Sequence, residues 1–415
     1  MREMKDSGLQ WAGDIPQYWN IAKGKHFMAV LERPVRDDDN VITCFRDGEV
    51  TLRSNRREDG FTVATVEAGY QGIEPGDLVV HGMDGFAGAI GISDSRGKGT
   101  PALNVLSCSE NKKYIMYLLR AMAYTEVFMA LSTGIRVRTC DTNWKKLKSL
   151  DYLIPPADEQ QCIADFLDAK CAEIDALTAD IQTQIDTLEQ YKRSVITETV
   201  TKGLNPNAEM KDSGIQWIGN MPAHWDVVRG KYILHYMQKP VREDDGVITC
   251  FRDGEVTLRS NRREEGFTMS DKEIGYQGID VGDLVVHGMD GFAGSIGISD
   301  SRGKASPVLN VLDTDQCKRY IMYYLRSMAY SDVFLALATG IRVRSCDLRW
   351  NKLAELSYPV PPLDEQNAIV KHIDSVLSKA DAVIADKEAQ LAILDEYKKS
   401  LIFEYVTGKK EVPVS

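Results

Sequence analysis

The chain consists of two copies of one unit, and this duplication constrains its fold more than any other feature of the sequence. Residues 41–60 (VITCFRDGEVTLRSNRREDG) recur at 247–266 with a single substitution, and residues 76–92 recur at 282–298, also with one. Both matches have an offset of 206 residues, and two units of that length account for 412 of the 415 residues. Solenoid repeats are only about 20–50 residues long. The pattern therefore predicts a fused pseudo-dimer of two domain-sized units.

Composition is that of a globular protein. The chain is 43% hydrophobic and 27% charged, which is ordinary for a folded domain, and 415 residues suffice for two or three cores. It contains no uncharged apolar run of about 18 residues and no apolar signal segment at its start, so we expect neither a membrane span nor secretion. None of the eight cysteines forms a CxxC pair. We therefore predict a cytoplasmic protein without a zinc site or disulfide framework.

Net charge is distributed unevenly along the chain. The formal value is −11, which would argue against a nucleic-acid partner if it were spread evenly. Residues 158–199 hold ten acids and three bases, and residues 364–404 hold nine acids and five bases. These two segments carry the whole negative charge, so the remaining residues are neutral and a DNA partner is not excluded.

The two acidic segments are predicted to be long helices. Neither glycine nor proline occurs from 158 to 200, and apolar residues recur at three- and four-residue steps. Prolines precede each segment, Asp-Glu-Gln occupies its first turn, and glycine follows its end. A helix of about 42 residues is roughly 60 Å long. The predicted stripe comprises Ile163, Phe166, Leu167, Ile174, Leu177, Ile181, Ile185, Leu188, Tyr191 and Val195 in the first copy, and Ile369, Ile373, Val376, Leu377, Ala380, Val383, Ile384, Leu391, Leu394, Tyr397 and Leu401 in the second.

The other two segments are predicted to be globular. They contain short β-like runs such as VITCF, EVTLR and DLVVHG, and a helix-like stretch at 113–132. We therefore predict an α+β protein with pseudo-two-fold symmetry, in which two similar mixed α/β domains are separated by a pair of long antiparallel helices. The predicted boundaries are 1–156 and 205–362 for the globular domains, and 157–204 and 363–415 for the helices, the last including the C-terminal tail.

The segment RSNRR is the first candidate for DNA contacts. Arginine pairs bidentately with guanine, asparagine with adenine, and serine or arginine also reaches phosphates. Acidic neighbours such as Asp47 and Glu49 leave a solvated, self-neutralised hairpin as an equal alternative. The candidate residues are Arg46, Arg53, Ser54, Asn55, Arg56 and Arg57, with Arg252, Arg259, Ser260, Asn261, Arg262 and Arg263 in the second copy.

The segment TGIRVR is the second candidate for DNA contacts. It supplies Arg136 and Arg138 in one copy and Arg342 and Arg344 in the other. Residues 133–150 hold five bases and one acid, which fits a patch that contacts the phosphate backbone. An ordinary basic helix end at the surface explains the same residues equally well.

No pattern in the chain indicates catalysis. The glycine-rich HGMDGFAG (81–88 and 287–294) has the spacing of neither a Walker loop nor a dinucleotide fingerprint. His81 and Asp84 within it could perform acid–base chemistry, but hydrogen bonding inside a tight turn is the favoured interpretation. A nucleophile elbow, an HExxH motif and paired metal-ligand spacing are all missing from the sequence. We therefore predict no catalytic residue, no bound metal and no cofactor.

Taken in order, the motifs resemble the specificity subunit of type I restriction–modification enzymes. KDSGxQWxGxxPxxW opens each half, GDLVV, FAGxIGIS and GIRVR follow, PPxDEQ starts each helix, and a VTKG-like sequence ends it. The resemblance implies that two target-recognition domains each read half of a split double-stranded DNA site. It also implies that the long helices dock two methyltransferase subunits. Those partners would carry S-adenosylmethionine, while a separate translocase/nuclease subunit would cleave.

One departure from the family pattern is informative. Specificity subunits usually carry two dissimilar recognition domains, whereas the two globular segments here are near copies. Two similar readers related by a two-fold axis recognise inverted half-sites, so we expect a palindromic or nearly palindromic bipartite target. A non-enzymatic coiled-coil adaptor with two protein-binding heads remains the alternative function. A nuclease is a weaker one, because Asp84 and Asp94 lack a third metal ligand nearby in the sequence.

Overall fold

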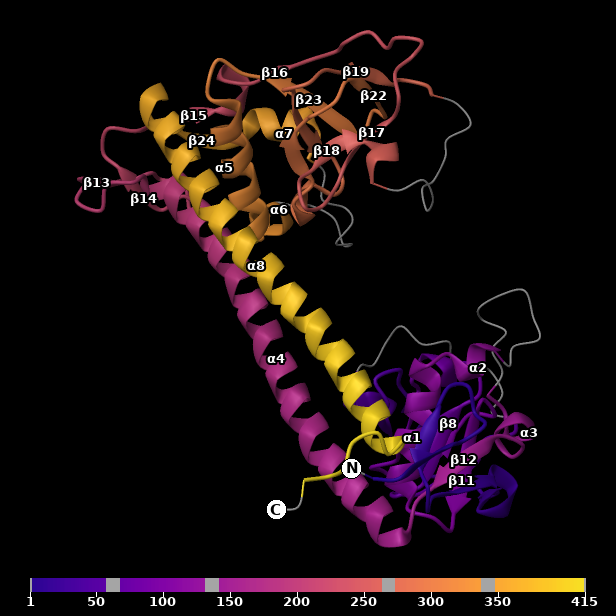
Figure 1. Cartoon of the computed structure of the whole chain (residues 1–415). Helices are drawn as coiled ribbons and strands as arrows, with labels where there is room; N and C mark the ends of the chain where they lie inside the picture. Colours follow the sequence, from indigo (N-terminus) through magenta and orange to yellow (C-terminus); the bar gives the residue numbers. More distant parts are fainter. Residues whose placement is uncertain (1, 57–67, 131–141, 263–272, 337–347, 414–415) are drawn as a thin grey trace. The chain divides into compact units, whose positions relative to one another are not determined.

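The computed structural model describes residues 2–56, 68–130, 142–262, 273–336 and 348–413 (Figure 1). The chain divides into two compact units. Unit 1 comprises Met1–Ile181 and Ala389–Ser415, and unit 2 comprises Gln182–Glu388. Each long helix therefore begins in one unit and ends in the other. Unit 2 is a continuous stretch of chain, whereas unit 1 is assembled from both ends of the chain.

The elements repeat in the same order in both units. In the first copy the strands are β1 (Met4–Asp6), β2 (Asp14–Pro16), β3 (Asn20–Lys23), β4 (Met28–Val30), β5 (Ile42–Cys44), β6 (Val50–Leu52), β7 (Gln71–Ile73), β8 (Leu78–His81), β9 (Ile90–Ile92), β10 (Gly97–Gly99), β11 (Leu103–Cys108) and β12 (Asp151–Ile154). The helices are α1 (Lys112–Tyr124), α2 (Val127–Ala130), α3 (Trp144–Leu147) and α4 (Ala157–Lys202).

The second copy follows the same plan. Its strands are β13 (Met210–Asp212), β14 (Asn220–Pro222), β15 (Asp226–Arg229), β16 (His235–Tyr236), β17 (Ile248–Cys250), β18 (Val256–Leu258), β19 (Gln277–Ile279), β20 (Leu284–His287), β21 (Ile296–Ile298), β22 (Gly303–Ala305), β23 (Leu309–Asp313) and β24 (Ser357–Val360). Its helices are α5 (Lys318–Tyr330), α6 (Val333–Ala336), α7 (Trp350–Glu355) and α8 (Leu363–Val406). The predicted α+β class with two long helices is confirmed.

A four-stranded antiparallel sheet lies at the centre of each unit. Its strand order is β4-β11-β8-β9 in unit 1 and β16-β23-β20-β21 in unit 2, and four two-stranded ladders surround each sheet. Helix α1 packs against β9, and ten of its thirteen residues are buried. The helix-like stretch at 113–132 contains two helices rather than one. Glu126 between them has a φ of 60°, a left-handed conformation that a continuous α-helix excludes.

The start of each long helix is fixed by the motif that opens it. The Gln160 side chain, almost fully buried, accepts a hydrogen bond from the backbone N–H of Asn111 (3.0 Å) and donates one to the carbonyl oxygen of Pro155 (2.9 Å). Glu159 accepts a hydrogen bond from the indole N–H of the buried Trp19 (3.0 Å). Gln366, Glu365 and Trp225 make the same contacts at the start of α8.

The end of each long helix is fixed by a buried tyrosine of α1 or α5. Tyr114 donates its hydroxyl to the carbonyl oxygens of Leu153 (3.0 Å) and Val406 (3.2 Å), so it ties the end of α8 to unit 1. Tyr320 donates to Val200 and Pro359 (both 3.0 Å) and ties the end of α4 to unit 2. Burial raises the pKa of both hydroxyls well above the ordinary value, so each remains a donor.

Within each unit the two helix segments run antiparallel. In unit 1 the Phe166 and Tyr405 rings lie 4.5 Å apart, and Asp175 binds Lys398 (2.6 Å). In unit 2 Lys192 binds Asp381 (2.6 Å). Lys192 and Lys398 are repeat equivalents, as are Asp175 and Asp381. The same two repeat positions therefore form an ion pair in both units. Helix α4 supplies the aspartate in unit 1 and the lysine in unit 2, and α8 supplies the other partner.

The predicted apolar stripe is only partly buried. Ile163, Ile174 and Ile181 lie in the interior, as expected. Leu177 and Tyr191 are exposed, and so are their repeat equivalents Val383 and Tyr397, which corrects their assignment to a buried face. An antiparallel pair covers a narrow seam on each helix, so residues at its edge keep contact with solvent. No helix in the described ranges is both long and apolar enough to cross a membrane.

A buried carboxylate fixes the loop that leads into β5. The Asp39 side chain is only 2% exposed and binds the Arg96 guanidinium (2.7 Å), while it also accepts the backbone N–H of Arg36 (2.8 Å). These contacts hold the pKa of Asp39 at about 2, below the ordinary 3.8, with the Arg96 hydrogen bonds as the largest cause. Asp245 and Arg302 repeat the pair in unit 2.

We expect the Asp39→Asn substitution to lower the free energy of unfolding at pH 5, with the difference from wild type shrinking as the pH falls. Because the pKa of the folded state is depressed, the stabilisation is fully present above about pH 4 and is lost as the pH falls through about 2. Urea unfolding of both proteins between pH 5 and pH 2 measures the difference. The exposed Asp38→Asn serves as control. A difference that stays constant over this range would contradict the assignment.

Candidate nucleic-acid interface

The first candidate segment lies at a β-hairpin and the short helix that follows it. Strands β5 and β6 pair antiparallel, and their turn contains Gly48 with a φ of +88°. A Cβ at Gly48 would collide with the Arg120 guanidinium, which α1 directs beneath the turn and which donates to the carbonyl oxygen of Ile90 (2.8 Å). Both the backbone conformation and this close approach require glycine here. The turn therefore packs closely on Arg120, which in turn binds β9 of the central sheet.

Arg56 is neutralised by its own hairpin. Its guanidinium binds Asp47 (2.5 Å) and Glu49 (3.2 Å) and lies 4.3 Å from the centre of the Phe45 ring. The side chain is 36% exposed, so it remains within reach of solvent. The acidic neighbours therefore pair with Arg56, and this pairing by itself does not decide between a DNA contact and a self-neutralised hairpin.

The other residues of the segment are arranged around a short 3₁₀ helix at Arg53–Asn55. Arg53 donates to the Thr43 hydroxyl (3.3 Å), and Asn55 donates to the Thr51 hydroxyl (2.8 Å). Ser54 and Asn55 are exposed. The segment thus presents polar side chains on a fixed backbone.

The glycine-rich turn lies against this hairpin. His81 Nδ1 accepts the backbone N–H groups of Met83 (3.2 Å) and Asp84 (3.0 Å), which confirms the favoured interpretation of hydrogen bonding inside the turn. Burial lowers the pKa of His81, which favours the neutral ring. Arg46 binds Asp84 (2.9 Å) and so connects hairpin and turn. A Cβ at Gly88, whose φ is +94°, would lie 2.7 Å from the Arg46 carbonyl oxygen.

Hairpin and turn together line a cavity of about 600 Å³ that is open to solvent. It combines guanidinium donors with carboxylate acceptors and an aromatic face. In the described part of the chain, no group of three or more His, Cys, Asp and Glu side chains is arranged to hold a metal ion. The cavity can therefore recognise hydrogen-bonding groups. Its lining residues are Thr43, Cys44, Phe45, Arg46, Asp47, Arg56, His81 and Asp84.

Unit 2 repeats these contacts. Arg262 binds Asp253 (2.6 Å) and Glu255 (3.1 Å) and lies 4.3 Å from the centre of the Phe251 ring. Arg252 binds Asp290 (3.0 Å). The short helix Arg259–Asn261 follows, with Ser260 exposed and Asn261 donating to the Thr257 hydroxyl (2.8 Å).

The remaining candidates lie outside the described residues. These are Arg57, Arg136 and Arg138, with Arg263, Arg342 and Arg344 in the second copy. Among the described residues, sequence reasoning did not assign Phe45, Asp47 and Asp84 to the site. Their adjacency to Arg46 and their place in the glycine-rich turn were the available signals.

Related proteins match nearly the whole chain, although no protein-family model matches it. A Methanocaldococcus jannaschii protein, whose name as the type I restriction enzyme MjaX specificity subunit is provisional, is 24% identical over 444 residues, covering 96% of this chain and 95% of the relative. The type I restriction enzyme StySPI specificity subunit of Salmonella potsdam is 19% identical over 430 residues, covering 96% and 90%.

A solved structure shares the fold. A chain from a study of complex assembly and conformational transition of the type I restriction–modification system superposes with a TM-score of 0.66 at 13% identity, covering 95% of this chain and 99% of that one. The relatives' names describe specificity subunits, which agrees with the prediction of a non-catalytic subunit. The resemblance to type I restriction enzyme specificity subunits is thereby confirmed along nearly the whole chain, in sequence by these relatives and in fold by the solved structure.

Proposed function

We propose that the chain is the DNA-recognition subunit of a type I restriction–modification complex and that each globular domain reads one half of a bipartite target. The observation that carries this proposal is the repeated hairpin, in which both units hold the same donors and acceptors in the same ion pairs. An arginine can donate two hydrogen bonds to guanine O6 and N7, and an asparagine can form two hydrogen bonds with adenine. An aspartate can accept a hydrogen bond from the cytosine N4 amino group. The relatives' names support a role in specificity.

The ion pairs of Arg56 are compatible with this role because they lie at the surface. Exposed ion pairs stabilise a protein by only about 0–1 kcal/mol. A guanine edge can therefore replace Asp47 as the partner of Arg56, and Asp47 is then free to accept from a neighbouring cytosine. The six candidate arginines outside the described residues stay predictions of phosphate or base contact.

Duplication of the hairpin and its ion pairs predicts the symmetry of the target. Two domains with the same groups recognise the same half-site sequence, and two like domains related by a two-fold axis would bind inverted half-sites. Single-molecule methylome sequencing of a host that expresses the system is expected to show a palindromic or nearly palindromic motif with an unspecified spacer. Two unrelated half-site sequences would refute the proposal that both domains recognise the same bases.

We expect Arg56→Ala combined with Arg262→Ala to weaken specific DNA binding by about 1–3 kcal/mol for each arginine that pairs bidentately with a base. Removal of each arginine also leaves two carboxylates near the DNA without their partner, which adds repulsion. Gel-shift titration of the reconstituted complex at fixed salt measures the change. If the arginines bind phosphates instead, affinity for all sequences falls equally and the salt dependence becomes shallower.

The matched control is Arg36→Ala with Arg242→Ala, a second pair of equivalent exposed arginines. Unchanged affinity in the Arg56/Arg262 variant, or an equal loss of affinity in the control, would remove these two arginines from the proposed site.

The long helices carry two equivalent sets of exposed apolar residues. Tyr191 and Tyr397 are 51% and 54% exposed, and their neighbours in the stripe, Leu177 and Val383, are exposed as well. Each unit contains one tyrosine and one aliphatic residue of this set. Exposed apolar side chains at two equivalent places fit two copies of one partner. We propose that these are the docking sites of two methyltransferase subunits, which would carry S-adenosylmethionine and the methylating site.

Tyr191→Asp or Tyr397→Asp alone is expected to leave one methyltransferase subunit in the purified complex, and the double variant none, because a carboxylate in an apolar contact is costly to desolvate. Native mass spectrometry counts the bound subunits. Gln190→Asp, which places the same charge at an exposed neighbouring position, should leave both bound. Full occupancy in the double variant would exclude these tyrosines from the docking surface.

A further inference from the structure

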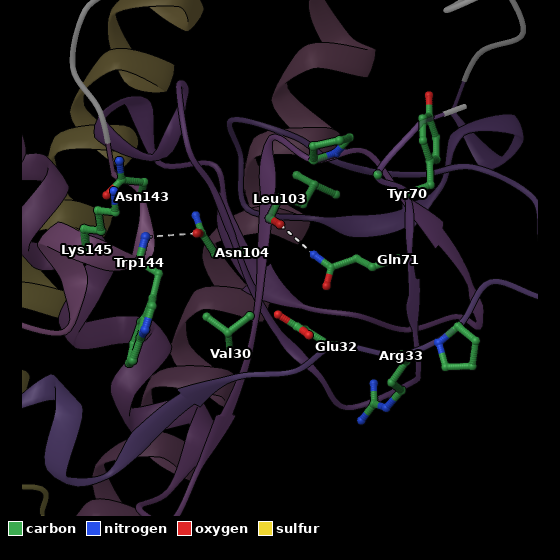
Figure 2. A pocket seen from close by; sticks show the side chains of 13 residues that line it. Val30, Glu32, Arg33, Tyr70, Gln71, Leu103, Asn104, Asn143, Trp144 and Lys145 are labelled. Carbon is green, nitrogen blue, oxygen red and sulfur yellow. Dashed lines mark hydrogen bonds between the residues drawn. The ribbon is translucent and has the colours of Figure 1, made fainter. Parts of the chain in front are cut away.

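Unit 1 contains a second cavity that the proposed DNA contacts do not use. It has a volume of about 710 Å³ and opens between β4, β7, β11 and the start of α3 (Figure 2). Aromatic, amide and charged side chains line it, so it differs from an ordinary packing defect. The lining includes Val30, Glu32, Arg33, Tyr70, Gln71 and Trp144.

Trp144 is held as a fixed wall of this cavity. Its backbone N–H donates to Asn104 Oδ1 (3.0 Å; Figure 2), and the Asn104 amide donates in turn to the carbonyl oxygens of Val80 and Thr142 (both 3.1 Å). The indole is partly buried against the core of unit 1. Because the backbone is anchored and the indole packs against the core, the ring can stack on a planar ligand at a reduced cost in conformational freedom.

In unit 2 an aromatic ring stacks on the tryptophan equivalent to Trp144. There Tyr236 stacks on Trp350, the equivalent of Trp144, with ring centres 5.9 Å apart and planes inclined by 28°. The residue at the equivalent position in unit 1 is Val30, which has no ring. The place that an aromatic ring occupies in unit 2 is therefore part of the cavity in unit 1.

Gln71 supplies a hydrogen-bonding group on another wall. Its amide nitrogen donates to the Leu103 carbonyl oxygen (2.8 Å), which leaves Oε1 turned to the side of Glu32 (Figure 2). In unit 2 the equivalent Gln277 is only 6% exposed, and its Oε1 has no hydrogen-bond partner among the described residues. A buried acceptor without a donor is unfavourable. This position thus presents an amide oxygen suited to an N–H group of a ligand.

We propose that the unit 1 cavity binds a single nucleobase, stacked on Trp144 and hydrogen-bonded to Gln71. Stacking requires a planar ring, and the Gln71 oxygen requires a ring or amino N–H, both of which nucleobases have. This inference rests on the proposed function, because the predicted DNA-contacting segments 53–57 and 133–138 lead in sequence to Tyr70 and Asn143 at the cavity. The base comes either from an extrahelical nucleotide of bound DNA or from a free nucleotide.

The first experiment tests free nucleotides. Saturation-transfer NMR of the full chain with each of the four deoxynucleoside monophosphates should saturate base protons more than sugar protons. Val30→Tyr, which introduces the ring that unit 2 already carries, should reduce the base-proton signal at least about fivefold. Tyr236→Val is the matched control in unit 2 and should not reduce it. Trp144→Leu removes the stacking wall and should reduce the signal independently.

The second experiment tests an extrahelical base. A duplex with one bulged 2-aminopurine should lose fluorescence on binding the full chain, because stacking on an indole quenches this base. The quenching should disappear in Val30→Tyr and persist in Tyr236→Val. A signal in either experiment that Val30→Tyr abolishes supports the proposal and identifies the source of the base.

Failure of the nucleobase site can be distinguished from failure of the proposed function. If neither probe responds, or if Val30→Tyr leaves both responses intact, the nucleobase site is wrong, even when gel shifts show that the complex binds duplex DNA. If the complex binds no duplex DNA at all, the proposed function fails instead. A loss of response in Val30→Tyr counts only if its thermal unfolding midpoint matches wild type. Otherwise the Trp144→Leu result decides.

Discussion

The architecture depends on how the ends of the two long helices are attached. A helix leaves unpaired N–H groups at its start and unpaired carbonyl groups at its end. At the starts, the buried Gln160 and Gln366 side chains bind the proline carbonyl before each helix and a backbone N–H of the globular domain. At the ends, the Tyr114 and Tyr320 hydroxyls donate to carbonyl oxygens of the last turn. Because each unit binds the start of one helix and the end of the other, neither unit has a complete core without both helices.

The charges of the candidate interface are balanced within each unit. Arg56 with Asp47 and Arg46 with Asp84 place two donors and two acceptors in one cavity. Such a surface has little long-range attraction for DNA and is better suited to discriminating base edges once DNA is close. On this view, non-specific affinity comes from other basic residues or from partner subunits.

Duplication has preserved the contacts of the hairpin, whereas the residues at the second cavity differ between the two copies. The ion-pair distances of Arg56 and Arg262 agree to within 0.1 Å. Near Trp144, by contrast, Val30 stands where Tyr236 does in the other copy, and Lys145 stands where Asn351 does. Val30 and Tyr236 lie in β4 and β16, each at the edge of its central sheet, and Lys145 and Asn351 lie in α3 and α7. The two copies therefore differ at these positions while their central sheets keep the same strand order.

The sequence by itself determined the repeat, the two long helices with their starts, strands such as β5, β6 and β8 with their repeats, and the hydrogen-bonded nature of the His81 turn. These features follow from offsets, periodicity and turn residues, which act over a few positions. Only the tertiary structure decided that each unit combines halves of both helices, that Leu177 and Tyr191 face outward, that Arg56 is paired with its own hairpin, and that Val30 faces Trp144. Each of these depends on contacts that the folded backbone creates, many between residues far apart in the chain. Local patterns carry no information about which distant side chains will meet.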